Sequence, residues 1–128
     1  YPLGFLGSSL EEILGYLFYL LSFLMGVPLA DITEVGSLLG QKMAINEFVA
    51  YSQLSEMIKA GKLAAKSELI ATFALCGFSN FASIAIQVGG IGSLAEERRG
   101  EIAALGIRAL IGGTLATYMT ATIAGILM

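Results

Sequence analysis

Glu47 is the residue of this chain that packing alone explains least well, because its carboxylate lies between two uncharged runs. The runs, residues 36–41 and 48–55, are each too short to cross a bilayer, and runs of this size are often buried or re-entrant. A carboxylate at membrane depth is costly and by default marks a site for a substrate, an ion or a proton. We therefore take Glu47 as a candidate binding residue, with Asn46 beside it as hairpin-tip support. The alternatives are an ion pair with Lys42 or exposure of Glu47 at the lipid headgroups.

A second group of polar side chains interrupts the longest uncharged stretch, residues 69–95, at a segment that contains Gly77 and Phe78 and ends at Asn80. Asn80 and Ser83 are three positions apart, so they share one face of any helix that resumes after the interruption. Their amide and hydroxyl groups suit a ligand with hydroxyls, such as a sugar, and Phe78 offers an aromatic face. Hydrogen bonding between helices is the equal alternative, since Asn and Ser commonly serve that purpose in membrane bundles.

The same sequence gives no indication of an enzyme. It has no His and only one Cys, so neither a catalytic triad nor a metal cluster can be assembled. Residues 90–95 match the dinucleotide pattern G-x-G-x-x-A, but a long uncharged run precedes them and residues 109–128 contain no acid, as that fold would need. We expect no cofactor. The basic residues are scattered in a chain of net charge −3, which does not suggest nucleic acid binding.

Composition predicts that these residues are carried by an all-α integral membrane protein. Hydrophobic residues make up 56% of the chain and charged residues only 13%, whereas soluble domains carry about 25% charged residues. As one helix, the 27 residues 69–95 would be about 40 Å long, against a hydrocarbon core of roughly 30 Å. Irregular backbone at that depth is tolerated only where it is buried in protein or lines a cavity. A discontinuous transmembrane helix of this kind is typical of transporter binding sites.

The first half of the chain predicts two further elements. Residues 1–30 form an interfacial or membrane helix, for which the capping boxes Ser8 with Glu11 and Ser9 with Glu12 signal the start. Its weakly polar stripe, which includes Tyr16, Tyr19 and Ser22, favours a helix that lies at the membrane surface. Residues 31–57, begun by Asp31 with Glu34, form a re-entrant helical hairpin with its tip near Asn46 and Glu47. An ordinary core hairpin or an amphipathic helix is the alternative.

The second half predicts the broken helix, residues 67–95 with Ser67 as its cap, and a final transmembrane helix, residues 100–128. Residues 109–128 are 20 uncharged residues, the length of a standard span. Small residues recur along this span and allow close helix packing. The pairs are Gly112 with Ala116, Gly113 with Thr117, and Ala121 with Gly125.

Two segments carry a family resemblance: residues 40–51 (GQKMAINEFVAY) and residues 74–87 (ALCGFSNFASIAIQ). Their motifs N-E-F-V-A-Y and C-G-F-S-N-F resemble the second re-entrant hairpin and the broken helix of the concentrative nucleoside transporters. Residues 97–127 look like the last cytoplasmic turn and transmembrane helix of that family. From about residue 13 onward, the chain is thus similar to the C-terminal part of the family, which is half of an inverted repeat.

The resemblance implies a cation-coupled nucleoside symporter, trimeric when intact and multi-pass in the cell (inner or plasma) membrane. In the family the positions of Glu47, Asn80 and Ser83 hold the ribose, and Phe78 lines the same pocket. The chain opens with Tyr1 and lacks the family's first hairpin and scaffold helices, so we take it as a fragment of a longer protein. The implied partners are the nucleoside, the bilayer and a missing N-terminal half, where the coupling cation, sodium or proton, should mainly bind.

One alternative of a different class remains from the residues alone. The small-residue helix faces suit a membrane structural or assembly subunit that only packs against other helices. Substitution at Gly112 or Gly113 would then be more harmful than substitution at Glu47.

Overall fold

The computed structural model describes the backbone of residues 10–128 and the side chains from Tyr16 onward. The capping boxes expected at Ser8 and Ser9 lie outside the described residues. Within the described part the chain is all-helical and contains no strand, which confirms the all-α prediction. The helices are α1 (Leu10–Leu24), α2 (Ile32–Ala44), α3 (Glu47–Lys59), α4 (Ala65–Ala74), α5 (Phe81–Gly92) and α6 (Arg99–Leu127), with short 3-10 turns at Leu29–Asp31 and Glu96–Arg98.

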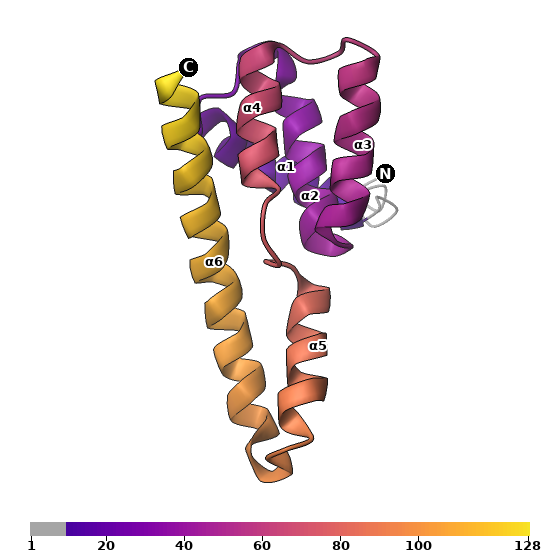
Figure 1. Ribbon diagram of the computed structural model, residues 1–128, viewed down its shortest axis with the longest axis vertical. Coiled ribbons are helices and arrows are strands. Elements are labelled where there is room, and N and C mark those ends of the chain that lie inside the picture. Colours follow the sequence, from indigo (N-terminus) through magenta and orange to yellow (C-terminus); the bar gives the residue numbers. More distant parts are fainter. Residues whose placement is uncertain (1–9) are drawn as a thin grey trace, which may run out of the picture.

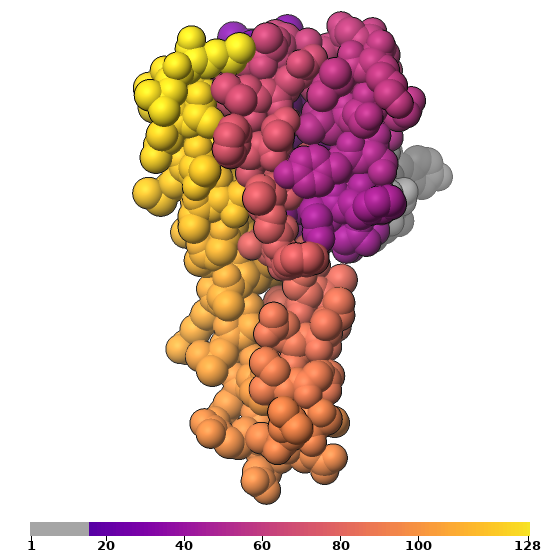
Figure 2. Space-filling view, viewed as in Figure 1, coloured from indigo at the N-terminus to yellow at the C-terminus, as the bar shows by residue number. Residues whose placement is uncertain are grey.

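The helices form a compact bundle with a narrow extension (Figure 1). Helices α1 to α4 make up the bundle, in which α2 and α3 run antiparallel as a helical hairpin. Helix α5 continues beyond the end of α4, and α6 runs back along both of them (Figure 1). In the space-filling view, α5 and the first part of α6 project from the bundle as a pair (Figure 2). The turn between α2 and α3 consequently lies next to the junction of α4 and α5.

The core is centred on α2, which packs most extensively against α1. Phe18 and Ser22 of α1 are buried, at the spacing of one helix face, and so is Met25 just beyond the end of the helix. Tyr16 and Tyr19 are exposed, so the predicted polar stripe is not a single surface: Ser22 lies in the core and the tyrosines do not. Helix α1 has 15 residues, fewer than the roughly 20 that a span needs. Its position at the membrane surface stays a prediction.

The start of α4 differs from the expectation. Ser67 was expected to cap the broken helix, yet α4 begins at Ala65 and Ser67 lies inside its first turn. The N-cap residue is Ala64, and Asp31 holds this end of the helix: its Oδ2 accepts hydrogen bonds from the Ala64 N–H at 2.9 Å and from the Ser67 hydroxyl. Asp31 makes no side-chain cap to its own helix α2. A carboxylate is favourable at this position because the N-terminus of a helix carries a partial positive charge.

The segment Glu96–Leu127 consists of the second 3-10 turn and α6, and it is long and apolar enough to cross a membrane. Among the described residues, it is the only helical segment that meets both conditions. One face of α6 packs closely: a Cβ on Gly113 would lie 2.7 Å from Ser79 Oγ, and one on Gly125 would lie 2.9 Å from Ile70. A Cβ on Gly112 would have no neighbour within 4 Å. Two of the three predicted small-residue pairs therefore lie on the packed face, and the pair that contains Gly112 does not.

Candidate functional site

The site is built at the interruption between α4 and α5, where residues 75–80 leave the helical path. Gly77 has φ +90°, a left-handed conformation that glycine adopts without steric cost. Helix α5 then begins with Asn80 as its N-cap. The Asn80 Oδ1 accepts hydrogen bonds from the Ser83 N–H at 2.8 Å and from the Ser83 hydroxyl at 2.9 Å. This cap fixes the side chains of Asn80 and Ser83 relative to each other.

At the tip of the α2–α3 hairpin, an asparagine again caps the start of a helix. Asn46 is the N-cap of α3, and its Oδ1 accepts a hydrogen bond from the Val49 N–H at 3.0 Å. Glu47 follows as the first residue of α3. The structure thus places Asn46 as the residue that orients the start of α3, and so the side chain of Glu47.

The two elements meet through their polar residues. The Asn80 Nδ2 donates a hydrogen bond of 3.0 Å to Glu47 Oε2. Asn80 is only 1% exposed, whereas Glu47 is half-buried and can be reached from outside. Glu47, Asn80 and Ser83 therefore form one continuous hydrogen-bonded chain between the hairpin and α5.

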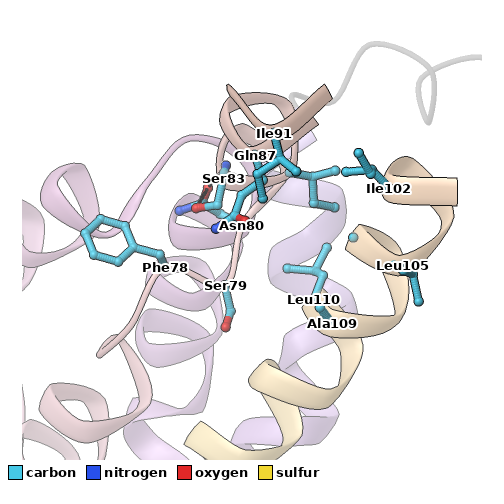
Figure 3. A pocket seen from close by; sticks show the side chains of 12 residues that line it. Phe78, Ser79, Asn80, Ser83, Gln87, Ile91, Ile102, Leu105, Ala109 and Leu110 are labelled. Atoms are coloured by element: carbon cyan, nitrogen blue, oxygen red, sulfur yellow. Dashed lines mark hydrogen bonds between the residues drawn. The ribbon is translucent and has the colours of Figure 1, made fainter. Parts of the chain in front are cut away.

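A cavity of about 400 Å³ opens beside Asn80 and Ser83, between α5 and α6 (Figure 3). Asn80, Ser83 and Gln87 supply polar groups to its wall, and apolar side chains supply most of the rest. The apolar residues are Phe78, Ile84, Ile91, Ile102, Leu105, Ala109 and Leu110. Phe78 is 80% exposed and extends away from the other side chains (Figure 3). The structure therefore brings Glu47, Asn80 and Ser83 together, with Phe78 at the edge of the group.

Lys42 is the residue of this site whose role the sequence did not reveal. Its side chain is 2% exposed, and its Nζ donates hydrogen bonds to the carbonyl oxygens of Ala74 at 3.1 Å and Cys76 at 3.0 Å. An ion pair with Glu47 was the expected alternative, but no such pair occurs in the described part of the chain. The only available signal was a lysine within an otherwise uncharged helix, and it did not indicate backbone carbonyls more than 30 residues away.

Other kinds of site find no support in the described residues. No group of three or more acidic, Cys or His side chains there could hold a metal ion. Gly90 and Gly92 of the dinucleotide-like pattern lie in the last turn of α5. A helix rather than a strand leads into them, so the match does not form a nucleotide-binding loop.

A helix that is broken where it meets the tip of a helical hairpin is typical of membrane transporters, so the fold and the site fit that class. Residues 3–125 match the family described as "Na+ dependent nucleoside transporter C-terminus". The chain therefore belongs to the concentrative nucleoside transporter family, to whose C-terminal region it corresponds.

Individual relatives agree with this assignment. The chain is 50% identical over 122 residues to the uncharacterized transporter YutK of Bacillus subtilis, and 42% identical over 121 residues to the nucleoside permease NupC of Helicobacter pylori. These matches cover 95% and 92% of this chain, but only 30% and 29% of the relatives. The structure of CNTnw in an inward-facing substrate-bound state matches with a TM-score of 0.83 and 45% identity, over 96% of this chain and 31% of that one. The chain thus spans about a third of the length of these relatives.

Proposed function

We propose that this chain provides the ribose side of the nucleoside site in a cation-coupled nucleoside symporter. Glu47, Asn80 and Ser83 hydrogen-bond the ribose hydroxyls, and Phe78 closes over the nucleoside from the edge of the site. The single observation that carries the proposal is the hydrogen-bonded chain that joins these three polar residues.

The chemistry of this chain suits a sugar. Hydrogen bonds to an ionised carboxylate are about twice as strong as neutral ones, so Glu47 is a strong acceptor for hydroxyl protons. Asn80 holds the carboxylate on one side through Oε2, and half-burial leaves it open on the other. A site built for hydroxyls discriminates strongly against analogues that lack them, because its polar groups are then left unpaired.

The remaining parts of the proposal concern the whole protein. The coupling cation is sodium or a proton, and it binds mainly in a region that lies outside this chain. The protein is a homotrimer that crosses the cell membrane several times. The relatives, of whose length this chain spans about a third, support a larger protein of this kind.

The test is uptake of labelled uridine by the whole transporter that carries this chain, in cells without other nucleoside transporters. We expect a Glu47→Gln variant to lose uptake at normal membrane levels, because an amide cannot replace the ionised acceptor. Glu56→Gln is the matched control: Glu56 lies on the same helix, and its side chain is 72% exposed. The control should transport normally.

The ion dependence of the same assay identifies the coupling cation. Uptake that requires a sodium gradient assigns sodium, and uptake that follows external pH assigns a proton. Equal uptake by Glu47→Gln and Glu56→Gln would contradict the ribose site. No uptake of any nucleoside by correctly inserted protein would favour the structural or assembly subunit, which the close packing of Gly113 and Gly125 also permits.

A further inference from the structure

The last carbonyl groups of α4 need hydrogen-bond donors from outside the helix. The last carbonyl groups of a helix have no partner within the helix. Where a helix ends at membrane depth, water is not available to satisfy them, and each unsatisfied group is costly. Partial negative charge also accumulates at this end. Helix α4 ends at Ala74, which is fully buried, immediately before the break.

The hairpin supplies the missing donors. Lys42, near the end of α2, bonds the carbonyl oxygens of Ala74 and Cys76. Tyr51, on α3, donates its hydroxyl proton to the carbonyl oxygen of Thr72 at 2.7 Å. Both arms of the hairpin therefore contact the end of α4.

The charges of the hairpin match the two sides of the break. Lys42 brings a positive charge to the carboxyl end of α4, where the helix dipole is negative. Glu47, five positions later, brings a carboxylate to the N-cap of α5, where the dipole is positive. In transporters, unwound carbonyls and the carboxyl ends of half-helices are the groups that coordinate a coupling cation. Here the ammonium group of Lys42 donates hydrogen bonds to two carbonyl oxygens of this kind.

We propose that Lys42 is a built-in cation: its ammonium takes the place that a free monovalent cation would fill at the broken helix, and thereby positions Glu47 against Asn80. Lys42 does not contact the substrate. It acts by fixing the hairpin to α4, because the same hairpin that carries Lys42 to the carbonyls carries Glu47 to Asn80. The effect on uptake rests on the proposed function, whereas the effect on the break does not.

The test removes the ammonium and returns it as a small molecule. A Lys42→Ala variant of the whole transporter, in liposomes, leaves space beside the Ala74 and Cys76 carbonyls for ethylammonium. We expect the KM for nucleoside to rise about tenfold or more, as for loss of a charged hydrogen bond, with little change in maximal rate. Backbone hydrogen exchange of residues 72–80 should also increase. Ethylammonium should reverse both changes, whereas tetramethylammonium, which has no N–H donor, should not.

Lys62→Ala is the matched control, because Lys62 is exposed in the connector between α3 and α4. It should change neither KM nor hydrogen exchange. If Lys42→Ala does not reach the membrane, Lys42→Arg and Lys42→Met replace it. The arginine variant keeps charge and donors and should exchange like the wild type, and the methionine variant should exchange faster.

Equal exchange in the arginine and methionine variants, or an alanine variant that ethylammonium does not restore, would overturn the proposal. If the wild type imports no nucleoside but hydrogen exchange responds to Lys42→Ala and to ethylammonium as expected, the nucleoside function fails and the built-in cation stands.

Discussion

Asn80 combines two hydrogen-bonding roles that few side chains can perform at once. Its carbonyl oxygen accepts from the Ser83 N–H and so starts α5, while its amide nitrogen donates to Glu47. Ser or Asp at this position would still cap the helix, since both are good N-cap residues. Neither residue carries the amide N–H that donates to Glu47, and an ionised Asp has no side-chain donor at all. A substitution at this position can therefore remove the contact with Glu47 and still leave the helix capped.

This separation yields a prediction for Asn80→Ser. The variant should keep α5 and its membrane level but bind nucleoside about tenfold or more weakly, because a hydrogen bond to a charged group is lost. Asn46→Ser is the matched control, since Asn46 uses its side-chain oxygen for a cap of the same kind on α3. Uptake at graded uridine concentrations measures the difference. An Asn46→Ser variant as impaired as Asn80→Ser would show that capping alone matters.

Residue types predicted part of this site. Glu47, Asn80 and Ser83 were singled out because polar groups in uncharged runs are costly, and the structure brings them together. The carbonyl contacts of Lys42 were missed because its partners are backbone atoms, which no side-chain pattern reveals. The resemblance placed Phe78 in the pocket, and in the structure Phe78 lines the cavity from its edge, with its ring extending away from the other lining side chains.

At the scale of elements, the prediction succeeded where the signal was local. The uncharged runs and the Gly77 interruption correspond to helices and to the break between α4 and α5. Two expectations failed because they depended on contacts between distant segments. Ser67 does not cap α4 but donates to Asp31, and Ser22 lies in the core while the tyrosines of its stripe are exposed. Helical spacing defines a face but does not say which face meets a partner.

The packing of α6 on α4 gives a prediction at this scale. Gly125→Ala would bring a Cβ to 2.9 Å from Ile70, which is fully buried and has little room to move. We expect the purified transporter to lose about 1–3 kcal/mol of stability, the usual cost of overpacking. Gly112→Ala is the matched control, with open space at its Cβ position. It should be neutral or gain up to about 1 kcal/mol from helix propensity.

Thermal unfolding of both variants in detergent measures this difference. Equal stability would contradict the close contact between α4 and α6. A loss at Gly112 alone would indicate that the exposed face of α6 packs against another subunit, as the structural alternative requires.

At the scale of the whole molecule, much apolar surface has no partner within the described residues. Large exposed side chains are most numerous on α1 and α6. They include Leu17, Leu20, Phe23, Ile111, Leu115, Met119 and Ile126. Exposed apolar surface on this scale marks a contact with lipid or with other protein.

A chimera tests whether this chain is an interchangeable part of such a transporter. Expressed by itself, the chain should reach the membrane but import no nucleoside, because it supplies only one side of the proposed site. When it replaces the matching 29% of NupC of Helicobacter pylori, to which it is 42% identical, uptake should return. Its buried contacts are internal, such as Lys42 with the α4 carbonyls and Gly125 with Ile70, so they should survive the transfer. The Glu47→Gln chimera should insert equally well and remain inactive. An inserted chimera without uptake would mean that surface contacts specific to each protein, rather than the internal site, limit transport.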